Sequence, residues 1–310
     1  MSRPHSSAAP LVAMLLTGLT LASHAQDCPS GGLALEARAT LPLPVTFGIE
    51  GVAAGANGAL ALWSAEGEVL AITTPGVLER RKLPDPIRPA GVALTPAGYR
   101  ILDRQTGRDY LLGEDSVPIV LDRVTLPTTE TLDQAVWQDG QWLLGLRDGA
   151  SREFHVRRGD TLVYRSIAGP TLKAIPRYHL SPAGPGLLLT GVTAPFELIR
   201  LTADGRADTL AGALPMAAAA LIPMDSLPLW RALPAVAIEC GVLVTLSDLT
   251  GDRRLLLRYS ESGRLEKVTL LDAPLGLMAR LTGANAVLAA RRAGTLELVW
   301  YDWRWIREPQ

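Results

Sequence analysis

Five charged residues stand at corresponding places along the chain, each directly before an apolar segment that we expect to form a strand: Glu50, Arg88, Asp133, Arg177 and Arg231. Acidic and basic side chains gathered at one low-dielectric surface can recognise a small anionic or zwitterionic ligand, because charge pairing is stronger there than in water. The same side chains can instead neutralise one another in a structural ring of ion pairs. The sequence leaves both interpretations open.

Sequence motifs of catalysis are otherwise scarce. The chain has no Gly-x-Ser-x-Gly elbow, no His-Glu-x-x-His, no phosphate-binding glycine-rich loop and no Cys-x-x-Cys pair. Beyond the N-terminal segment the histidines are His155 and His179, which we assign to a third and a first strand of two repeats. We interpret both as packed or surface histidines rather than as a base or a metal ligand. Whether the protein is an enzyme therefore stays open.

Strands must position these residues, and a repeated pattern predicts them. Residues 88–127 contain four short apolar runs separated by turns rich in Gly, Asp and Thr, which is the length of one blade of a β-propeller. Prolines that end a strand recur about every 43 residues, with one longer interval before the last. They are Pro42, Pro84, Pro127, Pro170, Pro215 and Pro274.

The second strand of each repeat is a near-continuous apolar run, as in Trp142–Leu146 and Val242–Leu246, which indicates burial on both faces. The fourth strands are mixed and charged, as exposed outer edges are. Five complete units follow Pro42, and the last repeat has three strands only. We expect the orphan strand Leu33 to Leu41 to pair with Leu296 to Tyr301 and to close an all-β, six-bladed β-propeller.

The N-terminus predicts export. A weakly basic start precedes an apolar run from Leu11 to Ala22, too short to span a bilayer, and Ser23-His24-Ala25 suits signal peptidase. We therefore assign residues 1–25 to a signal peptide and residues 26–310 to a single propeller domain, periplasmic or secreted, with no membrane span after cleavage. In an oxidising compartment Cys28 and Cys240 can form a disulfide.

One interval breaks the repeat. The surplus residues 216–231 lie between the fourth and fifth units and contain Met, Leu, Pro and Trp. They are expected on the face where propellers usually place a ligand site. The segment can form a short helix or arm over the channel and serve a partner surface, or it can pack down on the blades.

The segment Glu50-Gly51-Val52-Ala53, followed by Gly58 and a hydrophobic strand, resembles the opening repeat of six-bladed gluconolactonase and NHL-type propellers. In the lactonase branch a similar Glu binds a divalent metal, assisted by Asn and Asp of other blades. The resemblance thus implies that Glu50 is a metal ligand. Val52 and Ala53 replace the Pro-containing continuation of that branch, and Asn57 and Asn285 fall in turns predicted on the opposite face.

Composition excludes one class of partner. A formal net charge of -1 and no clustered basic face give no electrostatic footprint for nucleic acid. We predict an exported propeller that acts as a binding or protein-interaction module, for a protein partner or a small anionic ligand, without a cofactor. The alternative is a metal-dependent hydrolase of lactones or esters, with one divalent cation held by Glu50 and Asp133 and a metal-bound water as nucleophile.

Overall fold

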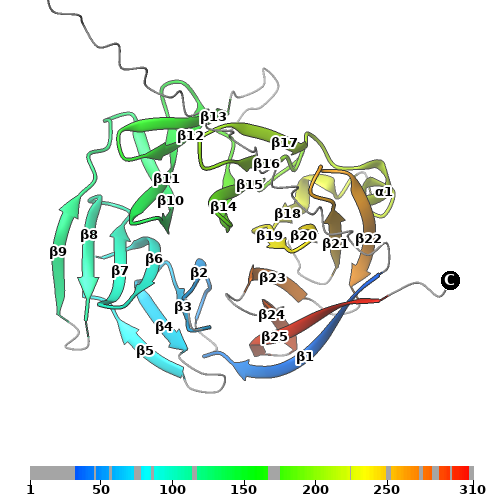
Figure 1. Ribbon diagram of the computed structural model, residues 1–310, viewed down its shortest axis with the longest axis horizontal. Coiled ribbons are helices and arrows are strands. Elements are labelled where there is room, and N and C mark those ends of the chain that lie inside the picture. The colour runs from blue at the N-terminus through cyan, green and yellow to red at the C-terminus, as the bar shows by residue number, and fades with distance from the viewer. Residues whose placement is uncertain are drawn as a thin grey trace, which may run out of the picture.

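The computed structural model describes residues 32–44, 47–55, 58–72, 78–84, 87–113, 117–166, 175–223, 225–248, 253–271, 275–280, 286–293 and 295–306. These residues form six antiparallel sheets arranged around a central axis (Figure 1). The chain is an all-β propeller, as the sequence predicts. The predicted signal peptide, residues 1–25, and Cys28 lie outside the described residues.

The sheets follow the chain in order. The first sheet contains β2 (Gly51–Ala54), β3 (Leu60–Trp63), β4 (Glu68–Ile72) and β5 (Leu78–Lys82). The second contains β6 (Pro89–Thr95), β7 (Gly98–Asp103), β8 (Arg108–Leu112) and β9 (Pro118–Arg123). The third contains β10 (Glu130–Gln138), β11 (Gln141–Asp148), β12 (Glu153–Arg158) and β13 (Thr161–Ser166). The fourth contains β14 (Tyr178–Ala183), β15 (Gly186–Gly191), β16 (Leu198–Leu201) and β17 (Ala207–Ala211). The fifth contains β18 (Trp230–Ala232), β19 (Val236–Ile238), β20 (Gly241–Asp248), β21 (Arg254–Tyr259) and β22 (Leu265–Leu271). The last contains β23 (Leu275–Arg280), β24 (Ala286–Ala293), β25 (Thr295–Ile306) and β1 (Gly32–Pro42).

The innermost strand of each sheet contacts the innermost strands of its two neighbours, in the cyclic order β2, β6, β10, β14, β19, β23 and back to β2. Gly91 of β6 makes one of these contacts possible, because a Cβ there would lie 2.2 Å from the carbonyl oxygen of Ala135 in β10. A side chain at this position would push the two sheets apart. The six inner strands therefore surround a common channel (Figure 1).

Burial follows the predicted strand order. All residues of β3 and β15 are buried, as expected for strands packed between neighbouring sheets. The outer strands β5 and β22 alternate between half-buried and exposed residues, and β5 carries Glu79, Arg80, Arg81 and Lys82. The outer strand β9 differs, because Ile119, Val120 and Leu121 are also exposed.

The N-terminal strand closes the ring. β1 pairs antiparallel with β25, and the predicted partners meet in register, with Leu41 opposite Leu298 and Ala37 opposite Tyr301. The pairing runs further than predicted, to Gly32 opposite Ile306, with one bulge between Ala37 and Ala39. The first and last strands of the described chain thus share one sheet, and the prediction of closure is confirmed.

The segment 216–231 packs against the sheets beside it. It contains the short helix α1 (Met216–Ala219) and the 3-10 turn Leu227–Leu229. Ala218, Ile222 and Trp230 are buried in a core cluster that they share with β15, β20 and β21, while Met216 remains 89% exposed. Among the described residues no helix is long and apolar enough to cross a membrane.

Leu298 tests the closure. It is fully buried in a core cluster with Leu41, so Leu298→Ala is expected to lower the free energy of unfolding by about 3 kcal/mol. Leu121→Ala on the exposed outer strand β9 is the matched control, with an expected change below about 0.5 kcal/mol. Urea unfolding measures both variants; equal effects would contradict the proposed role of the β1–β25 pair.

Candidate functional site

Three of the five predicted channel residues lie where the sequence places them. Glu50, Arg88 and Arg177 directly precede β2, β6 and β14, the inner strands of three sheets. The other two placements are wrong: Asp133 lies within β10 and Arg231 within β18. Short loops before the inner strands thus carry only part of the channel's charge.

A β-bulge explains the position of Asp133. The pairing of β10 with β11 shifts between Leu132 and Gln134, so Asp133 is the extra residue and has no partner in the ladder. Its side chain is 6% exposed, and Oδ1 receives Arg147 Nη2 at 3.2 Å and Arg177 Nη2 at 3.3 Å. The buried carboxylate is therefore held by Arg147 of its own sheet and by Arg177, which precedes β14 of the next sheet.

Glu50 pairs with Arg104, which directly follows β7 of the next sheet. Arg104 Nη1 donates to Glu50 Oε1 at 3.1 Å, and both side chains are partly exposed. Asp103 fixes the turn that presents Arg104, because its two carboxylate oxygens accept the backbone N–H groups of Arg88 and Thr106. The pair joins the first and second sheets at one end of the channel.

The two remaining predicted residues contact backbone carbonyls. Arg88 Nη1 donates to the carbonyl oxygen of Ile87 at 3.2 Å. Arg231 Nη1 donates to the carbonyls of Pro228 and Trp230, both at 2.7 Å. The guanidinium of Arg231 thus secures the segment that enters the fifth sheet.

His179 lies between these charged groups. Its Nε2 is 3.1 Å from the carbonyl oxygen of Ala232, and its Nδ1 is 3.2 Å from Gln134 Nε2. Since a carbonyl only accepts, Nε2 carries the proton and Nδ1 accepts from the amide of Gln134. Burial lowers the pKa of His179 to about 4, against weaker opposing effects of the Ala232 carbonyl and of Asp133. The imidazole is neutral at pH 7, and both nitrogens are engaged.

We name the group Glu50, Arg104, Asp133, Arg147, Arg177 and His179 the channel mouth. The charges of Glu50, Asp133 and Arg177 all act on the imidazole of His179, so both ion-paired groups lie within electrostatic reach of it. The channel mouth holds three guanidinium groups and two carboxylates. It can recognise opposite charge, and its excess charge is positive.

The sequence prediction missed Arg104 and Arg147. Both stand at the end of a second strand, β7 or β11, which meets the start of the first strand in an antiparallel hairpin. The end of the second strand lies beside the start of the first strand, so charged residues at the ends of second strands are the signal that identifies both arginines. His179 lies in the predicted strand and is a packed histidine, as the sequence predicts, with both ring nitrogens hydrogen-bonded.

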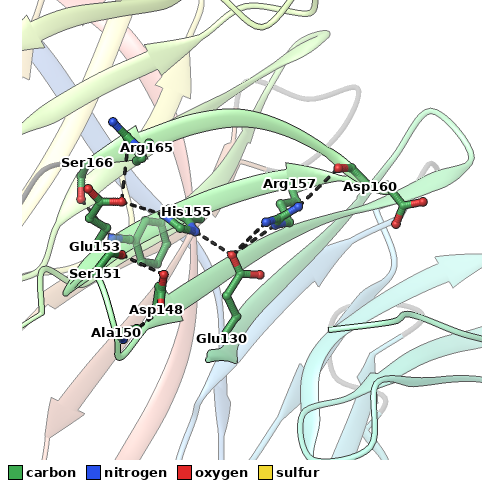
Figure 2. A network of polar contacts seen from close by, with 11 residues as sticks. Glu130, Asp148, Ala150, Ser151, Glu153, His155, Arg157, Asp160, Arg165 and Ser166 are labelled. Carbon is green, nitrogen blue, oxygen red and sulfur yellow. Dashed lines mark hydrogen bonds and ion pairs between the residues drawn. The ribbon is translucent and has the colours of Figure 1, made fainter. Parts of the chain in front are cut away.

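A second polar cluster lies in the third sheet. Figure 2 shows His155 of β12 between two carboxylates, with Nδ1 at 2.7 Å from Glu130 Oε1 and Nε2 at 3.0 Å from Glu153 Oε2. Arg157 Nη2 also reaches Glu130 Oε1 at 3.0 Å, and Arg165 lies 3.7 Å from Glu153. The cluster joins three strands of one sheet, β10, β12 and β13.

The carboxylates determine the charge of His155. Burial is the largest single effect and lowers the pKa of His155, but the hydrogen bonds to Glu153 and Glu130 together outweigh it, so that the pKa is raised above its usual range. The hydrogen bond from His155 in turn lowers the pKa of Glu153. This pattern is that of a charged structural cluster.

Glu50 and Asp133 do not fit the divalent cation implied by the lactonase resemblance. Glu50 Oε1 and Asp133 Oδ1 already accept from guanidinium groups, and a hard cation needs several oxygen ligands. Within the described residues no group of three or more His, Cys, Asp or Glu side chains is arranged to hold a metal. Packing explains why residue 51 is a glycine, because a Cβ there would lie 2.1 Å from the ring of Trp63.

No protein-family model matches the chain, and no curated protein matches it. Solved structures are similar. A protein of unknown function from Bacteroides thetaiotaomicron gives a TM-score of 0.55 at 12% identity, over 89% of this chain and 74% of that one. Catalytically inactive virginiamycin B lyase from Staphylococcus aureus, with quinupristin, gives a TM-score of 0.47 at 13% identity. The match covers 86% of this chain and 88% of the lyase. The WD40 β-propeller domain of Doa1 gives a TM-score of 0.45 at 12% identity. The match covers 87% of this chain and 97% of that domain. At 12% identity, the likeness to the Bacteroides thetaiotaomicron structure concerns the fold alone.

His155 predicts a pH-dependent stability. Because its folded pKa is raised, its contribution is complete below the unfolded value of about 6.5 and is lost as the pH rises through the folded pKa. His155→Gln should therefore lower the free energy of unfolding by about 1–3 kcal/mol at pH 5.5 and by less at pH 8.5. Urea unfolding at both pH values, with Arg206→Gln as control, measures the difference. An effect that grows with pH would contradict the prediction.

His179 predicts the opposite response. Its pKa is about 4 in the folded state and about 6.5 in the unfolded state, so the unfolded state binds a proton first as the pH falls. The free energy of unfolding therefore decreases between about pH 6.5 and pH 4. The loss attributable to this residue is at most about 3 kcal/mol. An NMR titration should show His179 as the Nε2–H tautomer at pH 7, titrating near pH 4. Titration at or above pH 6.5 would refute the assignment.

Proposed function

We propose that this chain is an exported six-bladed β-propeller that acts as a binding or protein-interaction module, with its ligand site at the channel mouth. The observation that carries the proposal is the set of charged side chains that the inner strands bring together there. Arg177 is 58% exposed, and Glu50 and Arg104 are 38% and 30% exposed, so these charges are accessible while their surroundings are partly desolvated.

The charge balance favours an acidic partner. Three arginines face two carboxylates, and the neutral His179 adds no positive charge of its own at pH 7. Partly buried guanidinium groups are suited to carboxylate recognition, because the planar donors can engage two acceptor atoms at once. The proposed ligand is thus a small anion or an acidic segment of a protein.

The proposal includes no cofactor. In the alternative, a hydrolase, one divalent cation would have to compete with Arg104, Arg147 and Arg177 for the oxygens of Glu50 and Asp133. Metal analysis of the mature protein, purified without chelators, separates the two. About one metal ion per chain, lost in Glu50→Gln together with ester or lactone hydrolysis, would establish the alternative and overturn the proposal.

We further propose a periplasmic or secreted location, with a disulfide between Cys240 and Cys28. Cys240 is buried, and no cysteine among the described residues is free. Such a bridge would close a loop of about 200 residues and contribute about 5 kcal/mol by the chain-entropy model. Thiol titration of the unfolded, unreduced protein is expected to find no free thiol.

Arg177→Gln tests the binding proposal. A thermal-shift screen of the mature protein against acidic metabolites and peptides is expected to find ligands that raise the melting temperature. Their affinity should fall about tenfold in Arg177→Gln, which removes one exposed charge from the mouth. Arg206→Gln is the matched control, because Arg206 is 74% exposed and paired with Asp208 at a distance from the mouth. Ligands that bind both variants equally would place the site elsewhere.

A further inference from the structure

The segment 216–231 exposes apolar side chains on one side while its other side packs into the core. Met216, Leu221 and Leu229 are 89%, 41% and 52% exposed. The exposed positions between them hold mainly alanine and proline, and Asp225 is the one charged residue among the described exposed positions of the segment. Apolar side chains that gather on one exposed segment are typical of an interaction surface.

Two arginines hold this segment at one end of the fifth sheet. Arg253 Nη2 donates to the carbonyl oxygen of Leu221 at 3.2 Å, and Arg231 Nη1 donates to two carbonyls of the segment at 2.7 Å each. The strands bring the two arginines to the same end, because Trp230 lies opposite Asp248 in the ladder and the Asp248 N–H donates to the carbonyl of Arg253. We name the following group the insertion surface: Met216, Leu221, Leu229, Arg231 and Arg253.

The two guanidinium groups of the insertion surface keep their positive charge unpaired. Neither Arg231 nor Arg253 forms an ion pair with a carboxylate of the described residues, and their contacts with the segment are to carbonyl oxygens. Asp248 is occupied differently, because its Oδ1 accepts the backbone N–H of Arg253. A guanidinium that is anchored through one nitrogen still presents planar donors to an incoming carboxylate.

We infer that the insertion surface docks a protein segment whose apolar side chains stand beside a carboxylate. The apolar residues of that segment contact Met216, Leu221 and Leu229, and its carboxylate pairs with Arg231 or Arg253. An exposed methionine suits this role, because its flexible thioether adapts to different apolar partners. The inference goes beyond the ligand site at the channel mouth and does not depend on it.

A lipid surface fits the same residues less well. Interfacial membrane sites use tryptophan or tyrosine beside clustered basic residues. The described exposed positions of the segment 216–231 include neither aromatic residue, because Trp230 is buried, and they include the carboxylate of Asp225. Composition therefore favours a protein partner.

Peptides selected on the mature protein from a display library of random dodecapeptides provide the probe. We expect them to combine leucine, methionine or phenylalanine with aspartate or glutamate. In fluorescence polarisation Met216→Asp should weaken their binding at least tenfold, because it places a charge among the apolar contacts, and Arg253→Gln should weaken it about fivefold. The matched controls Leu270→Asp, at a 48% exposed position on β22, and Arg206→Gln should leave the affinity unchanged. Melting temperatures establish that the variants are folded, and Met216→Asp alone suffices if another variant fails to fold.

Exchange of the acidic residues of a selected peptide for their amides should weaken binding about tenfold. The inference is wrong if no peptide is selected, if the amide peptides bind equally well, or if Met216→Asp leaves the affinity unchanged. It is also wrong if sedimentation shows a dimer that Met216→Asp dissociates, or if anionic lipid vesicles bind in a Met216-dependent manner while the peptides do not. Peptides that depend on Arg177 but not on Met216 would bind at the channel mouth, and then this inference falls while the proposed function stands.

Discussion

The antiparallel pairing of β1 with β25 is the interaction on which the rest of the structure depends. Each sheet buries its faces against two neighbours, so the ring is stable only if the last sheet also has two neighbours and a full set of strands. The chain meets this requirement by placing its N-terminal strand beside its C-terminal strand. Closure then fixes the inner strands around one channel, and residues distant in sequence, such as Glu50, Asp133 and Arg177, act on the same imidazole.

The pKa values of two histidines in this frame are shifted in opposite directions by their hydrogen-bond partners. Burial disfavours the imidazolium at both positions, so the partners decide the outcome. His155 lies between the carboxylates of Glu130 and Glu153, which stabilise the charged ring. His179 has an amide and a carbonyl as its direct partners, and the charges near it have both signs. The carboxylates of the third sheet therefore favour the protonated form of His155, while the surroundings of His179 favour the neutral imidazole.

The repeat, the buried second strands and the closing strand could be predicted from the sequence, because strand period, burial and proline positions are properties of local sequence. Glu50 and Arg177 could be placed for the same reason, since each directly precedes an inner strand. Asp133 could not, because a bulge moves it inside β10, and bulges depend on the pairing of two strands. The partners Arg104 and Arg147 also escaped prediction. Arg104 meets Glu50 across two sheets, and Arg147 meets Asp133 within one sheet at a bulge, so both pairs depend on contacts between strands.

The Glu50-Gly51 pair shows why a short motif does not establish a site. Its two residues have separate explanations: the ring of Trp63 leaves no room for a Cβ at position 51, and Arg104 pairs with the carboxylate at position 50. A metal site needs an excess of oxygen acceptors, whereas at this channel mouth the excess lies in N–H donors.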